Sequence, residues 1–255
     1  MASTDLRHIK ILELLHENKK MNVTDLAKAM DVSLVTMRKD LTILESKMLL
    51  FRGQGYVEIN ESTPVNKRML SNFEEKKRIA KKASELVNEN DIVFTESGSC
   101  CILLAEEIKN SGKKVTIITN STFIADFISP FNNIKLIILG GEYQQDSMAV
   151  VGHFTKNTIE NMHARLFFSG TDGYKAGKGF TGDNPERVEV LQKMSDRADK
   201  TVIITESRKF LSEGSFLLFS QDRADIVLTD DKLCDKTKKE LESSGIDVIC
   251  VWLNL

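Results

Sequence analysis

Short apolar runs alternate with longer stretches of helical periodicity from Asp91 to the C-terminus, and this alternation constrains the fold more than any other feature. The runs are rich in β-branched and aromatic residues and too uniformly apolar to leave one face in water, which is typical of buried parallel strands. Parallel neighbours need a crossover, and the helical stretches supply it. The sequence therefore predicts an α/β domain over residues 73–255, with a mostly parallel sheet and helices on both faces. The expected strands are Ile92–Thr95, Val115–Thr119, Ile134–Leu139, Leu166–Ser169, Val202–Thr205, Ile226–Thr229 and Val248–Trp252, with Trp252 in the core.

The first sixty residues are organised differently, as three short helical segments. We expect helices over Leu6–Glu17 and Asp25–Met30, and a third that begins after Ser33. Asn22 or Thr24 can cap the second helix and Ser33 the third, because their side-chain oxygens accept the free amide protons of a first turn. Apolar residues in the third helix recur at spacings of three and four, which predicts a stripe facing a core. The stripe consists of Leu34, Met37, Leu41, Leu44 and Met48.

Two short β-type runs follow this third helix and surround the turn Gly53–Gly55, which predicts a hairpin. Three helices and a hairpin make a winged helix-turn-helix over residues 1–60, and the third helix of that fold fits the DNA major groove. An arginine there can pair bidentately with guanine, whereas a lysine meets phosphate as a point charge. The alternative is that these cations only solvate an exposed helix, since such bundles also serve as protein docking modules. The expected DNA contacts are Ser33, Thr36, Arg38, Lys39 and Arg52.

Residues 61–72 lack apolar periodicity and contain Pro64, so we expect a linker there. An amphipathic helix rich in Lys and Glu is expected next, over Phe73–Asn88. Residues 61–82 hold 7 Lys and Arg against 3 Asp and Glu, whereas the whole chain has a net charge of −2. The front of the chain is therefore neutral to basic and the rest acidic, which permits DNA binding without proving it.

Composition narrows the class of protein further. The first residues carry charges through their apolar stretch, and no run is long enough to span a membrane, so we expect a cytoplasmic protein without a membrane partner. The 4 cysteines show no disulfide framework, and neither they nor the 4 histidines have the spacing of a metal site. We therefore expect no metal and no cofactor.

Small and polar residues follow five of the expected strands, at the edge of the sheet where α/β proteins bind ligands. Gly98–Cys100 open a helix, whose free amides and positive dipole end suit a phosphate. Lys209 could add a positive charge, and Asp172 could accept hydrogen bonds from sugar hydroxyls. One such loop can arise for steric reasons alone, but five at one edge favour a binding site. The candidate effector residues are Gly98, Ser99, Cys100, Asn120, Gly140, Asp172 and Lys209.

The expected recognition helix also carries a specific motif. The segments Val32–Ser33 and Thr36–Leu41 resemble the V-S-x-x-T-[IM]-R-[RK]-D-L signature of the DeoR family of bacterial transcription regulators. The resemblance implies DNA binding by this helix, with Asp40 in an internal role beside a basic residue. The wing departs from the family pattern, because the family has G-G-A where this chain has Gly53–Tyr56. A contact carried over to Arg52 is therefore less secure.

The C-terminal part resembles the sugar-phosphate sensor domain of the same family, which is similar in fold to ribose-5-phosphate isomerase. The family pattern includes D-x-G-[TS]-T, T-N-S, a G-G pair, G-x-D-G and D-x-S-K-F. This likeness implies that Gly98–Cys100 form a phosphate loop, with Asn120, Asp172 and Lys209 around the sugar. It also implies a repressor of a carbohydrate-utilisation operon, with a phosphorylated sugar or polyol as effector. We expect a homodimer or tetramer assembled through residues 73–255.

Five departures from the family pattern fall in this expected site. Glu96 and Glu206 replace Asp, Cys100 replaces Thr, Arg208 replaces Ser, and Leu191 replaces Lys. Leu191 removes one cation from the expected site and Arg208 adds another, which predicts a pocket with a different ligand preference. The effectors of the family therefore cannot simply be transferred to this chain.

Two other functions are compatible with these residues. A sugar-phosphate isomerase with an accessory DNA-binding domain could use Asp172, Lys178 and Lys209 as a base and cations for an enediolate. An isomerase does not need a complete recognition helix, so its presence favours the regulator over the enzyme. We therefore expect no catalytic residue. Cys100 and Cys101 could act as a redox sensor if the helix N-terminus lowered their pKa values, although adjacent cysteines bridge only with strain.

Overall fold

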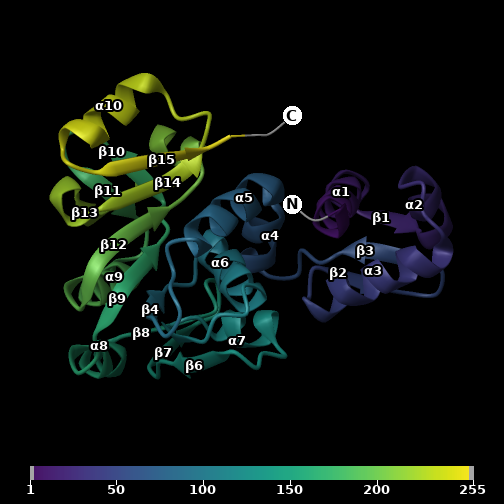
Figure 1. Ribbon diagram of the computed structural model, residues 1–255, viewed down its shortest axis with the longest axis horizontal. Helices are drawn as coiled ribbons and strands as arrows, with labels where there is room; N and C mark the ends of the chain where they lie inside the picture. The colour runs from purple at the N-terminus through teal and green to yellow at the C-terminus, as the bar shows by residue number, and fades with distance from the viewer. Residues whose placement is uncertain (1–2, 253–255) are drawn as a thin grey trace. The chain divides into compact units, whose positions relative to one another are not determined.

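The computed structural model describes residues 3–252 and divides the chain into two compact units, Met1–Glu74 and Glu75–Leu255 (Figure 1). The first unit is built from three helices and a small antiparallel sheet of strand order β1-β3-β2. Its elements are α1 (Ser3–Asn18), β1 (Lys20–Asn22), α2 (Val23–Ala29), α3 (Leu34–Ser46), β2 (Leu50–Arg52), β3 (Tyr56–Ile59) and α4 (Pro64–Leu70). This arrangement confirms the winged helix-turn-helix that the sequence predicts.

The expected apolar stripe of α3 contributes to the core of the first unit, with two exceptions. Met37, Leu41 and Leu44 of α3 are fully buried. Leu34, at the start of the helix, is 40% exposed. Met48 lies beyond the end of α3, where it adopts a positive φ of 56° and is only half-buried. The stripe therefore ends with the helix, because a residue in the left-handed region no longer follows the helical period.

The segment 61–72 is not the irregular linker that we expected. Thr63 accepts a hydrogen bond from the backbone amide of Asn66 and so caps α4, and Pro64 occupies the first turn, where it is tolerated. Val65 and Met69 are buried. We took Pro64 as a sign of a loop, but at this position proline begins a helix.

The second unit contains a seven-stranded sheet of order β15-β14-β12-β9-β4-β5-β6, in which every pairing is parallel. Its strands are β4 (Ile92–Thr95), β5 (Val115–Thr119), β6 (Ile134–Ile138), β9 (Ala164–Ser169), β12 (Ala198–Ile204), β14 (Ile226–Asp230) and β15 (Asp247–Val251). All seven expected strands are present, with ends shifted by a few residues. Trp252 is an exception to the expected core, because it follows β15 and is 72% exposed.

Helices and two smaller sheets complete the second unit (Figure 1). The helices are α5 (Phe73–Ser84), α6 (Ser99–Asn110), α7 (Thr122–Ile128), α8 (His153–Glu160), α9 (Pro185–Asp196) and α10 (Asp235–Ser243), with short 3₁₀ turns η1 (Ser207–Leu211) and η2 (Gln221–Arg223). The small sheets pair β7 (Glu142–Gln144) with β8 (Ala149–Val151), and β10 (Gly173–Lys175) with β11 (Gly179–Gly182) and β13 (Phe216–Ser220). Helix α9 packs against β9 and β12 and also against β11 and β13.

Aromatic residues join the large sheet to the β10-β11-β13 sheet. Phe167 makes edge contacts with Phe94 and with Phe219, at ring-centroid distances of 6.5 and 6.2 Å. All three rings are buried. Among residues 3–252, no helix is both long and apolar enough to cross a membrane.

Candidate DNA interface and effector site

The recognition helix α3 begins at a well-defined cap. The Ser33 hydroxyl accepts a hydrogen bond from the Thr36 backbone amide at 3.1 Å and lies 2.9 Å from the Thr36 hydroxyl. These two predicted DNA residues therefore also fix the start of the helix, because the Ser33 hydroxyl satisfies the Thr36 amide, which has no partner within the helix.

One face of α3 is exposed and carries two of the predicted DNA contacts, Arg38 for a base and Lys39 for a phosphate. Arg38 and Lys39 are exposed, and Val35 is 63% exposed. With Thr42 they lie three, four and seven residues apart, so they form one stripe opposite the buried face. Val35 was not among the expected DNA contacts, although an apolar residue on the exposed face of a recognition helix can contact a thymine methyl group.

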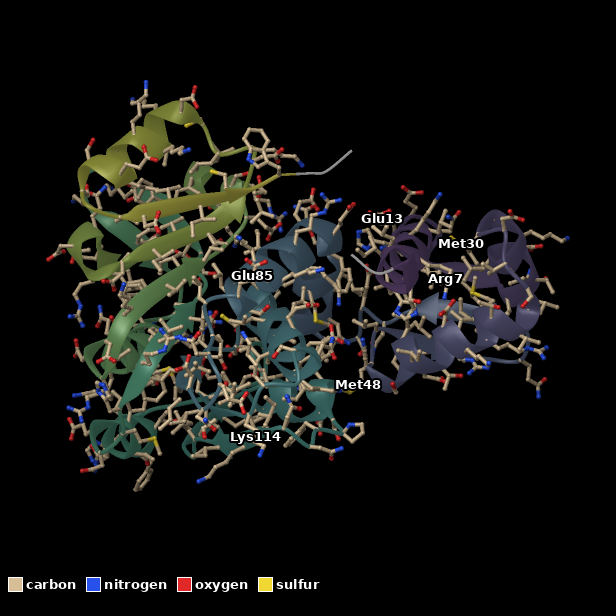
Figure 2. The ribbon with its side chains drawn as sticks, viewed as in Figure 1. Arg7, Glu13, Met30, Met48, Glu85 and Lys114 are labelled. Atoms are coloured by element: carbon tan, nitrogen blue, oxygen red, sulfur yellow. The ribbon has the colours of Figure 1, made fainter. Side chains whose placement is uncertain are left out.

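Asp40 has the internal role that we expected. It is 3% exposed and accepts hydrogen bonds from Arg7 Nε at 2.6 Å and Arg7 Nη2 at 2.9 Å. His8 Nε2 lies 3.0 Å from the same carboxylate. Burial opposes ionisation of Asp40, but the bonds from Arg7 and His8 outweigh it and lower the pKa of this carboxyl. Arg7 extends from α1 (Figure 2), so the two partners of Asp40 connect α1 to the recognition helix.

The wing arginine is engaged within the domain. Arg52 Nη1 donates to the Thr42 hydroxyl at 2.8 Å and lies 3.7 Å from Glu45 Oε2. The Arg52 backbone amide also donates to Glu45. Nearby, the ammonium of Lys20 lies 3.5 Å from the centre of the Tyr56 ring, a second cation that the sequence analysis did not identify.

The predicted effector site lies where the strand order of the large sheet reverses. From β4 the chain adds β5 and β6 on one side, and it then returns to place β9 on the other side of β4. Ligands of open α/β sheets bind beyond the carboxyl ends of the strands at such a switch point. Glu96 follows β4 and Gly170 follows β9. The Glu96 Oε1 atom accepts a hydrogen bond from the Gly170 amide at 3.0 Å, so this bond connects the two strand ends at the switch point.

Glu96 and Gly98 fit one another closely. Glu96 is 7% exposed, and its Oε1 also accepts the Cys101 thiol at 3.5 Å. Burial raises the pKa of the Glu96 carboxyl, although the bonds from Gly170 and Cys101 oppose this shift. A Cβ at Gly98 would overlap Glu96 Oε1. Any larger residue at position 98 would therefore force the Glu96 carboxylate to move, although the backbone angle at Gly98 is ordinary.

The first turn of α6 presents Ser99 and Cys100. Ser99 is half-buried and Cys100 is 6% exposed. Burial raises the pKa of the Cys100 thiol to about 12, and burial also raises the pKa of Cys101. Both thiols therefore stay protonated, and the redox hypothesis loses the activated thiolate that it needs.

Several buried polar atoms at this edge of the sheet lack a partner among the described residues. Asn120 is 1% exposed, and its Nδ2 donates to the Val150 carbonyl at 3.2 Å, but its Oδ1 has no hydrogen-bond partner. Three buried hydroxyls also have no hydrogen-bond partner among the described residues. They belong to Thr95 at the end of β4, Ser121 just after β5 and Thr229 near the end of β14. Because buried polar groups in native proteins nearly always bond to protein, water or ligand, these atoms are available to water or to a polar ligand.

Two cations belong to the same region. Lys209 is half-buried in η1 and acts electrostatically on Cys100, and Arg187 of α9 is half-buried and acts on Glu96. Neither side chain forms an ion pair within residues 3–252. Asp172 also acts on Glu96, and its Oδ2 accepts the Asp183 amide at 3.0 Å. The sequence analysis missed Arg187, which lies on a helix that follows no expected ligand loop.

Two of the residues named earlier lie apart from this cluster. Gly140 follows β6, two strands from β4; it is exposed, and its carbonyl accepts the Thr155 hydroxyl at 2.8 Å. Lys178 is exposed in the turn between β10 and β11. The structure thus brings together Gly98, Ser99, Cys100, Asn120, Asp172 and Lys209 at neighbouring strand ends, whereas Gly140 lies at their margin.

A winged helix-turn-helix joined to a parallel α/β domain, with a predicted ligand site at its switch point, is the arrangement expected of a ligand-responsive DNA-binding regulator. Family comparison agrees with this class. The model of the DeoR-like helix-turn-helix domain matches residues 7–63, and that of the DeoR C terminal sensor domain matches residues 71–231. The chain belongs to the DeoR family of transcription regulators.

Curated relatives match over nearly their whole length. The HTH-type transcriptional regulator GolR of Listeria innocua is 30% identical over 95% of this chain and 96% of its own. UlaR of Shigella dysenteriae is also 30% identical, over 96% and 98%. A relative in Escherichia coli O157:H7, 24% identical over 98% and 95%, is described as an aga operon transcriptional repressor. Among solved structures, ribose 5-phosphate isomerase A of Methanocaldococcus jannaschii is similar over 55% of each chain, at 17% identity and a TM-score of 0.41.

Proposed function

We propose that this chain represses a carbohydrate-utilisation operon and that a phosphorylated sugar or polyol controls its affinity for operator DNA. The buried, unpartnered Oδ1 of Asn120 carries the ligand part of this proposal. It lies one strand from the α6 N-terminus, in a region that also holds two cations without ion pairs among the described residues. Sugar hydroxyls would satisfy the buried acceptor and neighbouring hydroxyls, and a phosphate would suit the amides and the cations.

The DNA part rests on the exposed stripe of α3. Arg38→Ala should lower affinity for the operator much more than affinity for random DNA, because losing a bidentate base contact costs about 1–3 kcal/mol of discrimination. Lys39→Ala should weaken both by a similar factor, since a phosphate contact carries no sequence information. Both affinities can be measured by fluorescence anisotropy at one fixed salt concentration. An equal loss of the two affinities in Arg38→Ala would show that Arg38 contacts only phosphate.

The effector part can be tested at the first turn of α6. Ser99→Asp places a carboxylate where the phosphate should bind, so it should abolish the response to the effector while DNA binding persists. Lys209→Ala should weaken a phosphorylated ligand far more than its dephosphorylated analogue. Calorimetry with pairs of sugars and sugar phosphates measures both effects. Equal affinity of the wild type for the two members of every pair would refute the phosphate loop.

Assembly and the absence of catalysis are part of the same proposal. A single winged helix of this size buries too little DNA surface for tight selection, whereas a two-fold symmetric protein can bind both halves of a two-fold symmetric site. We therefore expect a homodimer or tetramer formed through residues 73–255. Sedimentation of the full chain as a monomer at micromolar concentration would contradict this. We assign no reaction, because Lys178 is exposed in a turn and the relatives are transcription regulators.

A further inference from the structure

The hairpin of β7 and β8 brings a further polar side chain to the region of the predicted effector site. Gln144 lies in β7, opposite Ala149 of β8, and Ala149 in turn pairs with Ser121, which follows β5. Directly paired residues of antiparallel strands place their side chains on the same face. Gln144 and Ser121 therefore share one face of this small sheet, on either side of the short Ala149 side chain.

Contacts of this hairpin run from one predicted effector residue to another. The backbone carbonyl of Asn120 accepts the Val150 amide at 2.8 Å, and Asn120 Nδ2 donates to the Val150 carbonyl at 3.2 Å. Gln144 Nε2 lies 3.4 Å from the oxygen of Asn184. The residue before Asn184 donates its backbone amide to Asp172 Oδ2 at 3.0 Å. Gln144 thus belongs to a set of contacts that connects Asn120 with Asp172.

The amide of Gln144 has a fixed orientation. Its Nε2 donates to Glu186 Oε2 at 2.6 Å, and an ionised carboxylate can only accept, so the nitrogen must face Glu186. Gln144 Oε1 therefore points the other way, and it is buried without a hydrogen-bond partner among the described residues. Asn120 follows the same pattern, because its nitrogen faces a carbonyl and its Oδ1 is buried and unpartnered. The Ser121 hydroxyl, in a residue with 0% exposure, also has no partner within residues 3–252.

Two amide oxygens that are held in place favour a ligand that donates hydrogen bonds. Sugar and polyol hydroxyls donate, whereas a carboxylate has only acceptors and would be opposed by the amide oxygen and by nearby Glu186. We propose that Gln144 accepts a hydrogen bond from a hydroxyl of the effector, beside Ser121, and so selects a phosphorylated polyol or sugar over the corresponding phosphorylated aldonic acid. This inference rests on the proposed function and adds the hydroxyl-binding end of the same site.

Matched ligands test this selection. Glucitol 6-phosphate and ribitol 5-phosphate are each titrated calorimetrically into the full-length protein beside the aldonic acid phosphate of the same carbon skeleton. The wild type should bind a polyol phosphate about tenfold more tightly than its aldonate partner, because the carboxylate leaves buried acceptors unpaired.

Gln144→Met removes the amide at nearly unchanged side-chain length. It should lower polyol phosphate affinity about tenfold, because a ligand hydroxyl loses its acceptor. It should leave the affinity for inorganic phosphate unchanged, since phosphate is expected at the first turn of α6. A merely structural role of Gln144 would lower both affinities. Gln145→Met is the matched control, because it makes the same replacement at the exposed neighbour and should change neither.

Glu186→Gln is a second variant, and it serves also if Gln144→Met does not fold, as judged by circular dichroism. It removes the carboxylate that holds the Gln144 nitrogen, so the amide can turn and the preference for polyol over aldonate should decrease. An unchanged preference in this variant would contradict the proposed orientation of the amide.

The outcomes separate this inference from the proposed function. Unchanged polyol phosphate affinity in Gln144→Met, or equal wild-type affinity for polyol and aldonate partners, would overturn the role of Gln144 alone, provided that Ser99→Asp loses phosphate binding. Binding of inorganic phosphate but of neither polyol phosphate would also overturn only this inference. Absence of all phosphate binding by the wild type would overturn both.

Discussion

The bond between Arg7 and Asp40 should determine how firmly the recognition helix is held. Arg7→Met removes both hydrogen bonds from Arg7 to the Asp40 carboxylate and leaves His8 as the remaining side-chain partner of this carboxylate among the described residues. Asp40 has a side-chain exposure of 4%, so its carboxylate would be left largely dehydrated, whereas Arg7 is 22% exposed and partly screened by water. Breaking a buried pair costs about 3–5 kcal/mol and an exposed pair under about 1 kcal/mol, so we expect a loss of about 2 kcal/mol.

Hydrogen exchange of the α3 amides in the full-length protein measures this loss, because exchange reports the free energy of local opening. A loss of about 2 kcal/mol corresponds to about 30-fold faster exchange. Arg38→Met is the matched control, since it makes the same replacement at an exposed arginine, and it should leave exchange unchanged. Arg7→Met/Asp40→Asn should recover part of the protection, because the buried charge is gone. Wild-type exchange in Arg7→Met, or lower protection in the double variant than in the single one, would refute this reasoning.

Three further predictions concern pH, packing and reactivity. Folding lowers the pKa of His8 through burial and the pKa of Asp40 through its hydrogen bonds, so the unfolded chain binds more protons than the folded chain. Protection of the α3 amides should therefore decrease as the pH drops below about 6.5, the ordinary pKa of histidine. His8→Gln should remove the part of this decrease that begins at the higher pH. Gly98→Ala should displace Glu96 and abolish phosphate binding in calorimetry, and normal affinity would show that Glu96 can move freely. Iodoacetamide should modify exposed Cys234 first, because hydrogen bonds from Thr237 lower its pKa; mass spectrometry that found the α6 thiols equally modified would contradict their burial.

Sequence patterns predicted the elements whose formation depends on local periodicity. All seven strands of the large sheet were expected because each contains a short apolar run, although the edge strands β6 and β15 are only partly buried. The three-residue strand β1 was missed, since Lys20–Asn22 is neither apolar nor alternating and is a strand only because it pairs with β3. The β10-β11-β13 sheet was missed for the same reason: Gly173 and Gly179 carry no strand signal, and the pairing joins residues far apart in the chain.

The sequence was sufficient to predict where in the fold the candidate site lies, but not which distant side chains folding brings to it. Glycine and serine after strands located the edge of the sheet. Arg187 was missed, because an arginine on a charged helix is ordinarily solvated, and only folding brings it near Glu96, far along the chain. Trp252 was placed in the core by its strand, yet the strand ends one residue earlier.

The contact between Arg52 and Glu45 has a consequence for the salt dependence of DNA binding. A cation that neutralises a phosphate releases counterions from DNA, and each such contact steepens the decline of affinity with salt. Arg52 lies 3.7 Å from the Glu45 carboxylate, so it brings a negative charge with it toward any phosphate that it approaches. We therefore expect the wing to contribute less than a full counterion to this slope, and the ionic part of DNA binding to depend mainly on exposed cations of α3 such as Lys39.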